Sequence, residues 1–282
     1  MKMCYNVQTC AEGSSLENDV ILCEKVGYHY MEINYAKTDE YLKDHTLEQL
    51  GNLLKDHGIA AASVNAIFGT QFCTEENFNR VKDQYLHACE IGQATGAPCT
   101  IVLSGEWSDV PQGATRADIE KDSIETLHRL ADVGVPYGMK IAYEPVGTMT
   151  VGSIQYSWDV VRKVDRPEVG LAPDIFNLFL FDLLRDVDDL RQIDKDKIFI
   201  VHIDDAEDLP FAEVNQMHRV FPGTGRANCI GFMEAIKSTG YDGPVSMEVL
   251  NPTIWAKGAE IVIPEAYERG KWLLSEIGAF EE

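Results

Sequence analysis

Four ionisable side chains stand at the ends of short apolar runs in the second half of the chain. They are Glu144 after KIAY, Asp174 after VGLAP, His202 after IFIV and Glu248 after PVSM. A charged group at such a position is costly to bury unless it is paired or bound to a metal. Three carboxylates side by side repel one another, so a divalent cation is their natural neutraliser. Oxygen-rich ligation with one imidazole suits Mn²⁺, Mg²⁺, Co²⁺ or Zn²⁺, and the residues do not choose among them.

The elements that bring these residues together follow from the alternation along the chain. Near-continuous apolar runs rich in β-branched residues are typical of parallel strands buried on both faces. Strands are expected at 3–7, 28–34, 59–66, 98–104, 139–144, 168–174, 198–203 and 244–250. Helical patterns lie near 15–26, 46–57, 74–95, 115–134, 153–164, 178–192, 231–238 and 258–276. We therefore expect an α/β fold, a single-domain (β/α)8 TIM barrel over residues 1–282, with chemistry at the carboxyl ends of its strands.

The same residues also allow a second fold and simpler roles for each side chain. A doubly wound open sheet is the alternative fold, although no GxGxxG follows the first strand. A single histidine at a strand end is commonly a structural residue, and a single Glu or Asp there often caps a loop or forms a salt bridge. Four such residues on consecutive strands favour a shared site. A Schiff-base lysine is another route to carbonyl chemistry, but Lys140 and Lys197 stand at strand starts, at the opposite end of the barrel.

Composition argues against nucleic-acid binding, secretion and a membrane-spanning segment. The chain has 282 residues and a formal net charge of −22, which repels a phosphate backbone and argues against nucleic-acid binding. Its seven cysteines are odd in number and form no CxxC, a pattern typical of reduced thiols in a cytoplasmic protein. The start MKMCYNV has no signal-peptide core, and no apolar run approaches the ~18 residues of a membrane span.

Short motifs along the chain resemble those of the xylose-isomerase-like TIM barrels, a family of sugar isomerases, epimerases and AP endonucleases. The motifs are YEP at 143–145, APDIFN at 172–177, VHIDD at 201–205, FPGTG at 221–225 and SMEV at 246–249. The likeness covers almost the whole chain and is strongest to the isomerases of inositol catabolism that act on keto-inositols (inososes). The AP-endonuclease branch fits poorly, because it needs several metal sites rich in histidine.

The resemblance assigns roles to particular residues. Glu144, Asp174, His202 and Glu248 match the metal ligands of the family, and Glu144 and Glu248 also match its acid/base pair. Arg219 matches a substrate-contacting arginine, with a surface ion pair as the alternative. The family usually has a histidine three residues after the aspartate, but Asn177 stands there. That departure leaves the substrate open.

The resemblance implies a divalent-metal-dependent isomerase that moves a carbonyl between adjacent carbons of a keto-cyclitol or ketose through an enediolate. Mn²⁺ is the leading metal, with Zn²⁺, Co²⁺ and Mg²⁺ open. The alternatives are a ketose epimerase, a lyase or dehydratase subunit acting on a keto-glycoside or keto-inositol, and a non-catalytic polyol-binding protein. The expected partner is a small polyol or keto-sugar, and a homo-oligomer is left open.

Several further residues have weaker assignments. Glu32 ends the second expected strand and either contacts substrate or forms a structural pair with another side chain. Trp107 either forms a wall of the sugar pocket or has only a packing role. Asp204 and Asp205 either support the site or cap the next segment. The PGTG stretch at 222–225 predicts a turn first. It is a weak candidate for a phosphate cradle, because no P-loop lysine follows it. We therefore expect an unphosphorylated substrate.

Overall fold

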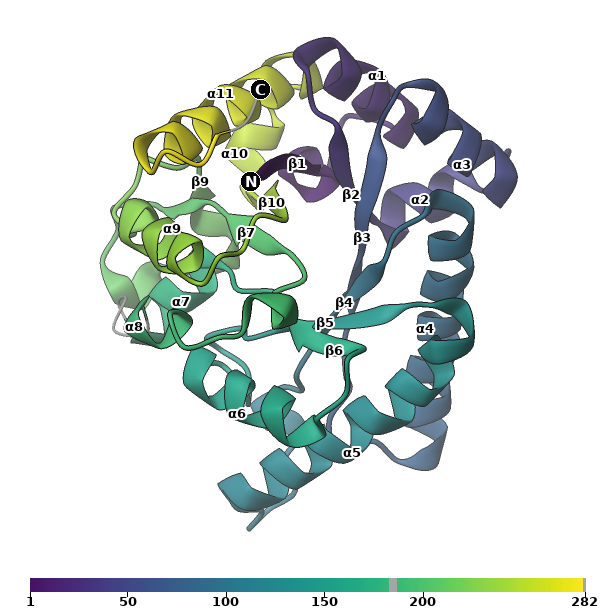
Figure 1. Cartoon of the computed structure of the whole chain (residues 1–282), viewed down its shortest axis with the longest axis vertical. Coiled ribbons are helices and arrows are strands. Elements are labelled where there is room, and N and C mark those ends of the chain that lie inside the picture. Colours follow the sequence, from purple (N-terminus) through teal and green to yellow (C-terminus); the bar gives the residue numbers. More distant parts are fainter. Residues whose placement is uncertain (183–186, 281–282) are drawn as a thin grey trace.

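The computed structural model describes residues 1–182 and 187–280, and within them eight parallel strands form a barrel (Figure 1). The strands are β1 (Lys2–Asn6), β2 (Tyr30–Asn34), β3 (Ala60–Ile67), β4 (Cys99–Leu103), β5 (Lys140–Glu144), β6 (Val169–Leu171), β7 (Val201–Ile203) and β10 (Pro244–Met247). Their order is β6-β5-β4-β3-β2-β1-β10-β7. Each expected strand is therefore present, and the TIM-barrel prediction is confirmed.

The barrel closes between β6 and β7, where the ladder is weakest. Isolated parallel bridges pair Leu171 with Ile198 and Asp174 with His202. The strand expected over 168–174 stops early because Pro173 has no N–H to give to a neighbour. The Pro173 carbonyl instead accepts the His202 amide at 2.9 Å. This bond brings the segment around Asp174 beside β7 although Asp174 lies outside a regular strand.

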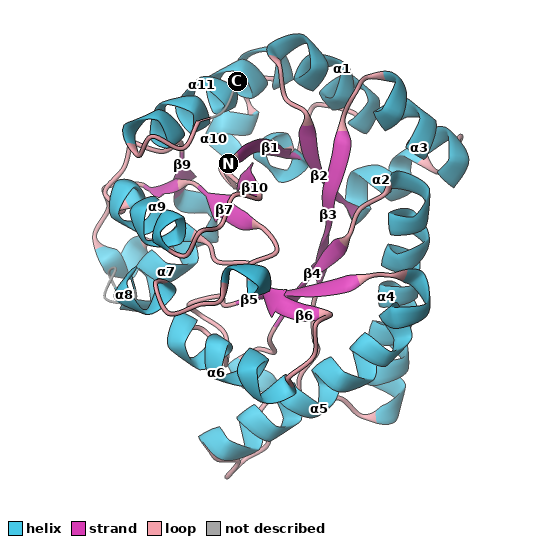
Figure 2. Cartoon of the chain, in the orientation of Figure 1, coloured by secondary structure: helices cyan, strands magenta, loops and turns pink. Residues whose placement is uncertain are grey.

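Helices surround the strands, so the barrel is a ring of strands inside a ring of helices (Figure 2). The longer helices are α1 (Leu16–Val26), α3 (Leu47–Asp56), α4 (Glu75–Thr95), α5 (Arg116–Gly134), α6 (Ile154–Val164), α9 (Cys229–Ser238) and α11 (Ala259–Glu276). Most begin at a side-chain cap, as Thr46 and Thr115 do in full capping boxes, because such a cap satisfies an otherwise unpaired N–H.

Several elements differ from the expected ones. The helix expected at 178–192 begins earlier, as α7 (Ile175–Asp182), because Asp174 Oδ1 accepts the Asn177 amide at 2.6 Å and so caps it. A short α8 (Val187–Leu190) follows, and residues 183–186 lie outside the described residues. The additional elements are α2 (Tyr35–Tyr41), α10 (Pro252–Trp255) and an antiparallel pair, β8 (Asp205–Ala206) and β9 (Arg219–Val220).

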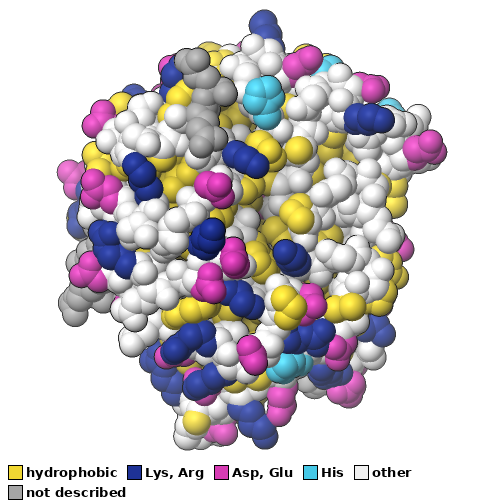
Figure 3. Space-filling view, viewed as in Figure 1, with side chains coloured by type: hydrophobic (Ala, Val, Ile, Leu, Met, Phe, Trp, Pro, Cys, Tyr) yellow, Lys and Arg dark blue, Asp and Glu magenta, His cyan; other side chains and the backbone are white. Residues whose placement is uncertain are grey.

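The barrel interior is packed with small and aliphatic side chains, among them Cys4, Ala62, Cys99, Ile101, Ala142 and Ile200. All seven cysteines are free thiols, and all but Cys73 are buried. Among the described helices, none is long and apolar enough to cross a bilayer. On the face shown in Figure 3, Lys and Arg side chains lie among Asp and Glu side chains.

Candidate active site

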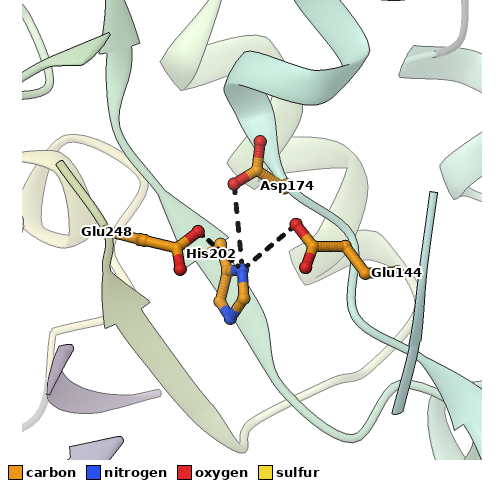
Figure 4. Close-up of side chains that lie close together, drawn as sticks. All are labelled: Glu144, Asp174, His202 and Glu248. Carbon is orange, nitrogen blue, oxygen red and sulfur yellow. Dashed lines mark ion pairs between the residues drawn. The ribbon is translucent and has the colours of Figure 1, made fainter. Parts of the chain in front are cut away.

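The four residues that the sequence singled out meet at one point at the carboxyl end of the barrel. Glu144 ends β5, Asp174 follows β6, His202 lies in β7 and Glu248 follows β10. Their ligand atoms lie within 4.8 Å of one another. His202 Nδ1 is 3.5 Å from Glu144 Oε1, 3.3 Å from Glu248 Oε2 and 3.8 Å from Asp174 Oδ2 (Figure 4). The geometry brings together three carboxylate oxygens and one imidazole nitrogen.

The donor set fits a divalent cation. His202 Nδ1 is buried and has no hydrogen-bond partner among the described residues, although it faces the three carboxylates. Burial lowers the pKa of His202, but the carboxylates of Glu32, Glu248 and Glu144 outweigh burial and raise that pKa well above its usual value. The centre of the cluster thus favours a positive charge, and a metal ion supplies one without a proton.

The two glutamates are the members of the cluster that keep a trace of solvent exposure. Asp174 and His202 have no solvent exposure, whereas Glu144 and Glu248 keep 4% and 5%. In Figure 4 the two glutamates flank His202 from opposite sides. Burial holds the pKa of Glu144 above its usual value, while His202 and Arg219 hold that of Glu248 below its usual value despite burial. The two carboxylates therefore lie in unlike electrostatic environments.

Arg219 is buried within the cluster rather than lying on the surface. Its Nη1 donates to Asp174 Oδ2 at 2.7 Å, to Asp204 Oδ2 at 2.6 Å and to Glu248 Oε2 at 3.1 Å. The surface ion pair considered as an alternative is thus wrong. The described cluster contains five buried carboxylates, Glu32, Glu144, Asp174, Asp204 and Glu248, against the guanidinium of Arg219 and the imidazole of His202. That imbalance again calls for added positive charge.

Glu32 lies beneath His202, on the side away from Nδ1. Its two carboxylate oxygens, Oε1 and Oε2, lie 3.2 Å and 3.1 Å from His202 Nε2. Asn6 and Asn65 each donate Nδ2 to Glu32 and to Glu248 Oε1, at 2.9–3.0 Å, and Ser246 adds a further bond to Glu32. Since a carboxylate on the far nitrogen of a histidine fixes which nitrogen is free to bind a metal, this arrangement presents Nδ1 to the centre.

Asn177 and a residue not singled out in the sequence, Gln216, lie over the cluster. Asn177 Nδ2 donates to Glu144 Oε1 at 2.8 Å. Gln216 Nε2 donates to Asn177 Oδ1, and Gln216 Oε1 accepts from Arg219 Nη2, both at 2.8 Å. Gln216 belongs to a loop with no regular apolar pattern, so its position three residues before Arg219 was the only signal in the sequence.

Trp107 and the PGTG stretch lie away from the metal-binding cluster. Trp107 belongs to a 3-10 turn, Trp107–Asp109, after β4 and is 60% exposed, so it stands outside the buried cluster. The PGTG stretch is a turn held by Asp205, whose carboxylate accepts the amides of Gly223, Gly225 and Ala227 at 2.7–3.0 Å. These amides are therefore already bonded to a carboxylate.

Comparison with known proteins places the chain among enzymes. Residues 20–268 match the family described as xylose isomerase-like TIM barrel. An inosose isomerase of Bacillus velezensis is 33% identical over 98% of both chains, and one of Bacillus subtilis is 34% identical over 94% of this chain and 95% of its own. The crystal structure of IOLI protein with a bound zinc atom superposes with a TM-score of 0.93 and 33% identity over 100% of both chains.

These relatives match nearly end to end, and they show that the chain is an isomerase. The zinc atom in the solved relative and the buried cluster here together support one divalent metal ion. The motifs quoted from the sequence predicted this kinship. The chain belongs to the xylose isomerase-like TIM barrel family.

Proposed function

We propose that this chain is a divalent-metal-dependent isomerase that moves a carbonyl between adjacent carbons of a keto-cyclitol, an inosose. The observation that carries the proposal is the convergence of Glu144, Asp174, His202 and Glu248 at one buried point. The inosose isomerases that match the chain over nearly its full length support the same substrate class. We also propose that residues 1–282 act as one domain.

The four residues of the cluster would hold the metal, through His202 Nδ1 and one oxygen of each carboxylate. We expect Mn²⁺ first, because the family resemblance implies it, while the zinc in the solved relative keeps Zn²⁺ open. When bound, the ion supplies Lewis acidity that polarises a ketone and its neighbouring hydroxyl. Asp174 and His202 have no solvent exposure, so we assign them to holding the ion alone.

Glu144 and Glu248 perform the proton transfers. One carboxylate accepts the proton of the carbon that bears the hydroxyl next to the ketone, giving an enediolate. The same or the facing glutamate returns a proton to the former ketone carbon, and the hydroxyl proton passes to the former ketone oxygen as the new carbonyl forms. No redox partner is needed, because the carbonyl and the alcohol exchange places within one molecule.

The other residues assigned to substrate binding lie at different positions relative to the cluster. Arg219 directs its guanidinium between Asp174 and Glu248, where it would orient a hydroxyl or carbonyl oxygen. Asn177 contacts Glu144 and stands where the family usually has histidine. Trp107, exposed after β4, remains our proposed wall of the substrate pocket. Glu32 is fully buried against His202 Nε2, so we assign it to holding that imidazole rather than to contact with substrate.

The test is ¹H NMR of the Mn²⁺-loaded protein with 2-keto-myo-inositol in D₂O, with Glu248→Gln as the variant. We expect new inosose signals that carry deuterium at the adjacent carbon, and their loss in the variant. Deuterium at the original carbon with inverted configuration would identify an epimerase, and loss of water from the substrate would identify a dehydratase. No turnover and no exchange with the metal bound would refute the inosose assignment.

A further inference from the structure

Gln216 connects the two ends of the cluster through a continuous series of hydrogen bonds. The series runs from Arg219 Nη2 to Gln216, then to Asn177, then to Glu144 Oε1, and each bond is 2.8 Å long. We infer that Gln216 is a positioning residue that sets the orientation of the Asn177 amide and, through it, of Glu144. This inference deepens the proposed function and rests on it for the role of Glu144 in proton transfer.

The direction of every bond in the series follows from the chemistry of arginine. A guanidinium has donors only, so the Gln216 oxygen must face Arg219 and the Gln216 NH₂ must face the other way. That NH₂ needs an acceptor, so Asn177 turns its Oδ1 towards Gln216. Asn177 Nδ2 is then left to donate to Glu144. The cation at one end of the series and the Glu144 carboxylate at the other therefore favour the same two amide orientations.

The backbone around Gln216 holds its side chain inward. Gln216 begins a short 3-10 turn, Gln216–His218, which Asn215 caps through its side chain, while His218 Nδ1 accepts the Asn215 amide. The neighbouring side chain of Met217 is 43% exposed, whereas Asn177 and Arg219 are 1% and 3% exposed. The turn thus directs one glutamine into an otherwise buried network and leaves its neighbour in solvent.

The alternative orientation of Asn177 shows what Gln216 contributes. Without Gln216, Asn177 Oδ1 loses its donor, and Glu144 alone distinguishes the two ends of the Asn177 amide. A half-turn of that amide would place Oδ1 against Glu144 Oε1, which sets two acceptors against each other. Glu144 Oε1 is also the oxygen that faces His202 Nδ1. A shift there changes both a ligand of the proposed metal and one of the two proton-transfer groups.

The experiment uses Gln216→Met, which keeps the approximate size of the side chain and removes both hydrogen bonds. Its matched control is Gln192→Met, at an exposed glutamine near α8. We expect kcat for the inosose to fall about tenfold, with KM within about threefold of the parent. The visible absorption spectrum of the Co²⁺-loaded protein should also change in Gln216→Met and not in the control.

A double variant separates positioning from general structural support. If Gln216 acts through Asn177, Asn177→Ala combined with Gln216→Met should have the kcat of Asn177→Ala within about twofold. Multiplying losses in the double variant, or an unchanged kcat and Co²⁺ spectrum in Gln216→Met, would overturn the inference. The Co²⁺ spectrum needs no turnover, so it decides the role of Gln216 even if the parent protein proves inactive on inososes.

Discussion

At the scale of the residue, the two nitrogens of His202 have opposite surroundings. Nε2 contacts Glu32, while Nδ1 faces three carboxylates without a hydrogen-bond partner among the described residues. Glu32 is itself completely buried and held by Asn6, Asn65 and Ser246. We therefore assign to Glu32 the task of keeping the Nε2 proton in place, so that Nδ1 keeps its lone pair for a metal.

This assignment predicts the behaviour of Glu32→Gln. The amide keeps the size of the side chain but removes the charge that orients His202, so Mn²⁺ affinity should weaken about 10- to 100-fold. Isothermal titration calorimetry measures the dissociation constant directly. The matched control is Glu40→Gln, because the Glu40 side chain is 71% exposed. Equal affinities in the parent and Glu32→Gln would remove Glu32 from the metal centre.

The sequence predicted the side chains of the cluster better than their supports. Glu144 and His202 were predictable because apolar runs identify strands, and strand ends in a barrel converge. Asn6 and Gln216 were not, because an amide carries no charge pattern and its partners lie far away along the chain. Arg219 was located through a family motif, but its burial against Asp204 depends on how the loop after β7 folds back.

At the scale of the element, the parts that the sequence missed are short and lack a repeating apolar pattern. The helix α2 has seven residues and buries a lysine, Lys37. Lys37 Nζ forms an ion pair with Asp19 of α1 and donates to the carbonyl of Cys10 at 2.7 Å. A buried ion pair, rather than helix propensity, therefore fixes α2 against α1, and such pairs are invisible to sequence periodicity.

We predict that Lys37→Met destabilises the protein strongly. The substitution leaves the buried Asp19 carboxylate without its cation, which costs about 3–5 kcal/mol in comparable buried pairs. Urea unfolding followed by circular dichroism measures the loss in the free energy of unfolding. The control is Lys43→Met, whose side chain is 65% exposed and pairs with an exposed Glu40, and which should leave the unfolding midpoint unchanged. A midpoint for Lys37→Met equal to that of the control would contradict this account of α2.

At the scale of the whole molecule, the charge of the chain and the charge of the site have the same sign. The net charge is −22, and five of the carboxylates that contribute to it are buried together at one end of a closed barrel. The carboxylates of the cluster repel one another in the folded state, and a bound cation would cancel that repulsion. Metal binding should therefore stabilise the folded state. We therefore expect metal binding and folding of the barrel to be coupled.

The prediction is that metal removal lowers the melting temperature. With free Mn²⁺ at one hundred times its dissociation constant, binding to the folded state alone adds about 2.7 kcal/mol to the free energy of unfolding. Differential scanning calorimetry of the chelated and Mn²⁺-loaded protein measures the difference. His202→Ala lacks the imidazole ligand, so Mn²⁺ should shift its melting temperature far less. Equal shifts in both proteins would mean that the stabilising ion binds elsewhere.

The most direct test of the central claim is the position of the metal itself. We would soak crystals with Mn²⁺ and collect anomalous diffraction at the manganese edge. The account predicts one strong peak between His202 Nδ1 and one oxygen each of Glu144, Asp174 and Glu248. A peak bound through His202 Nε2, or a manganese site that excludes these residues, would contradict it.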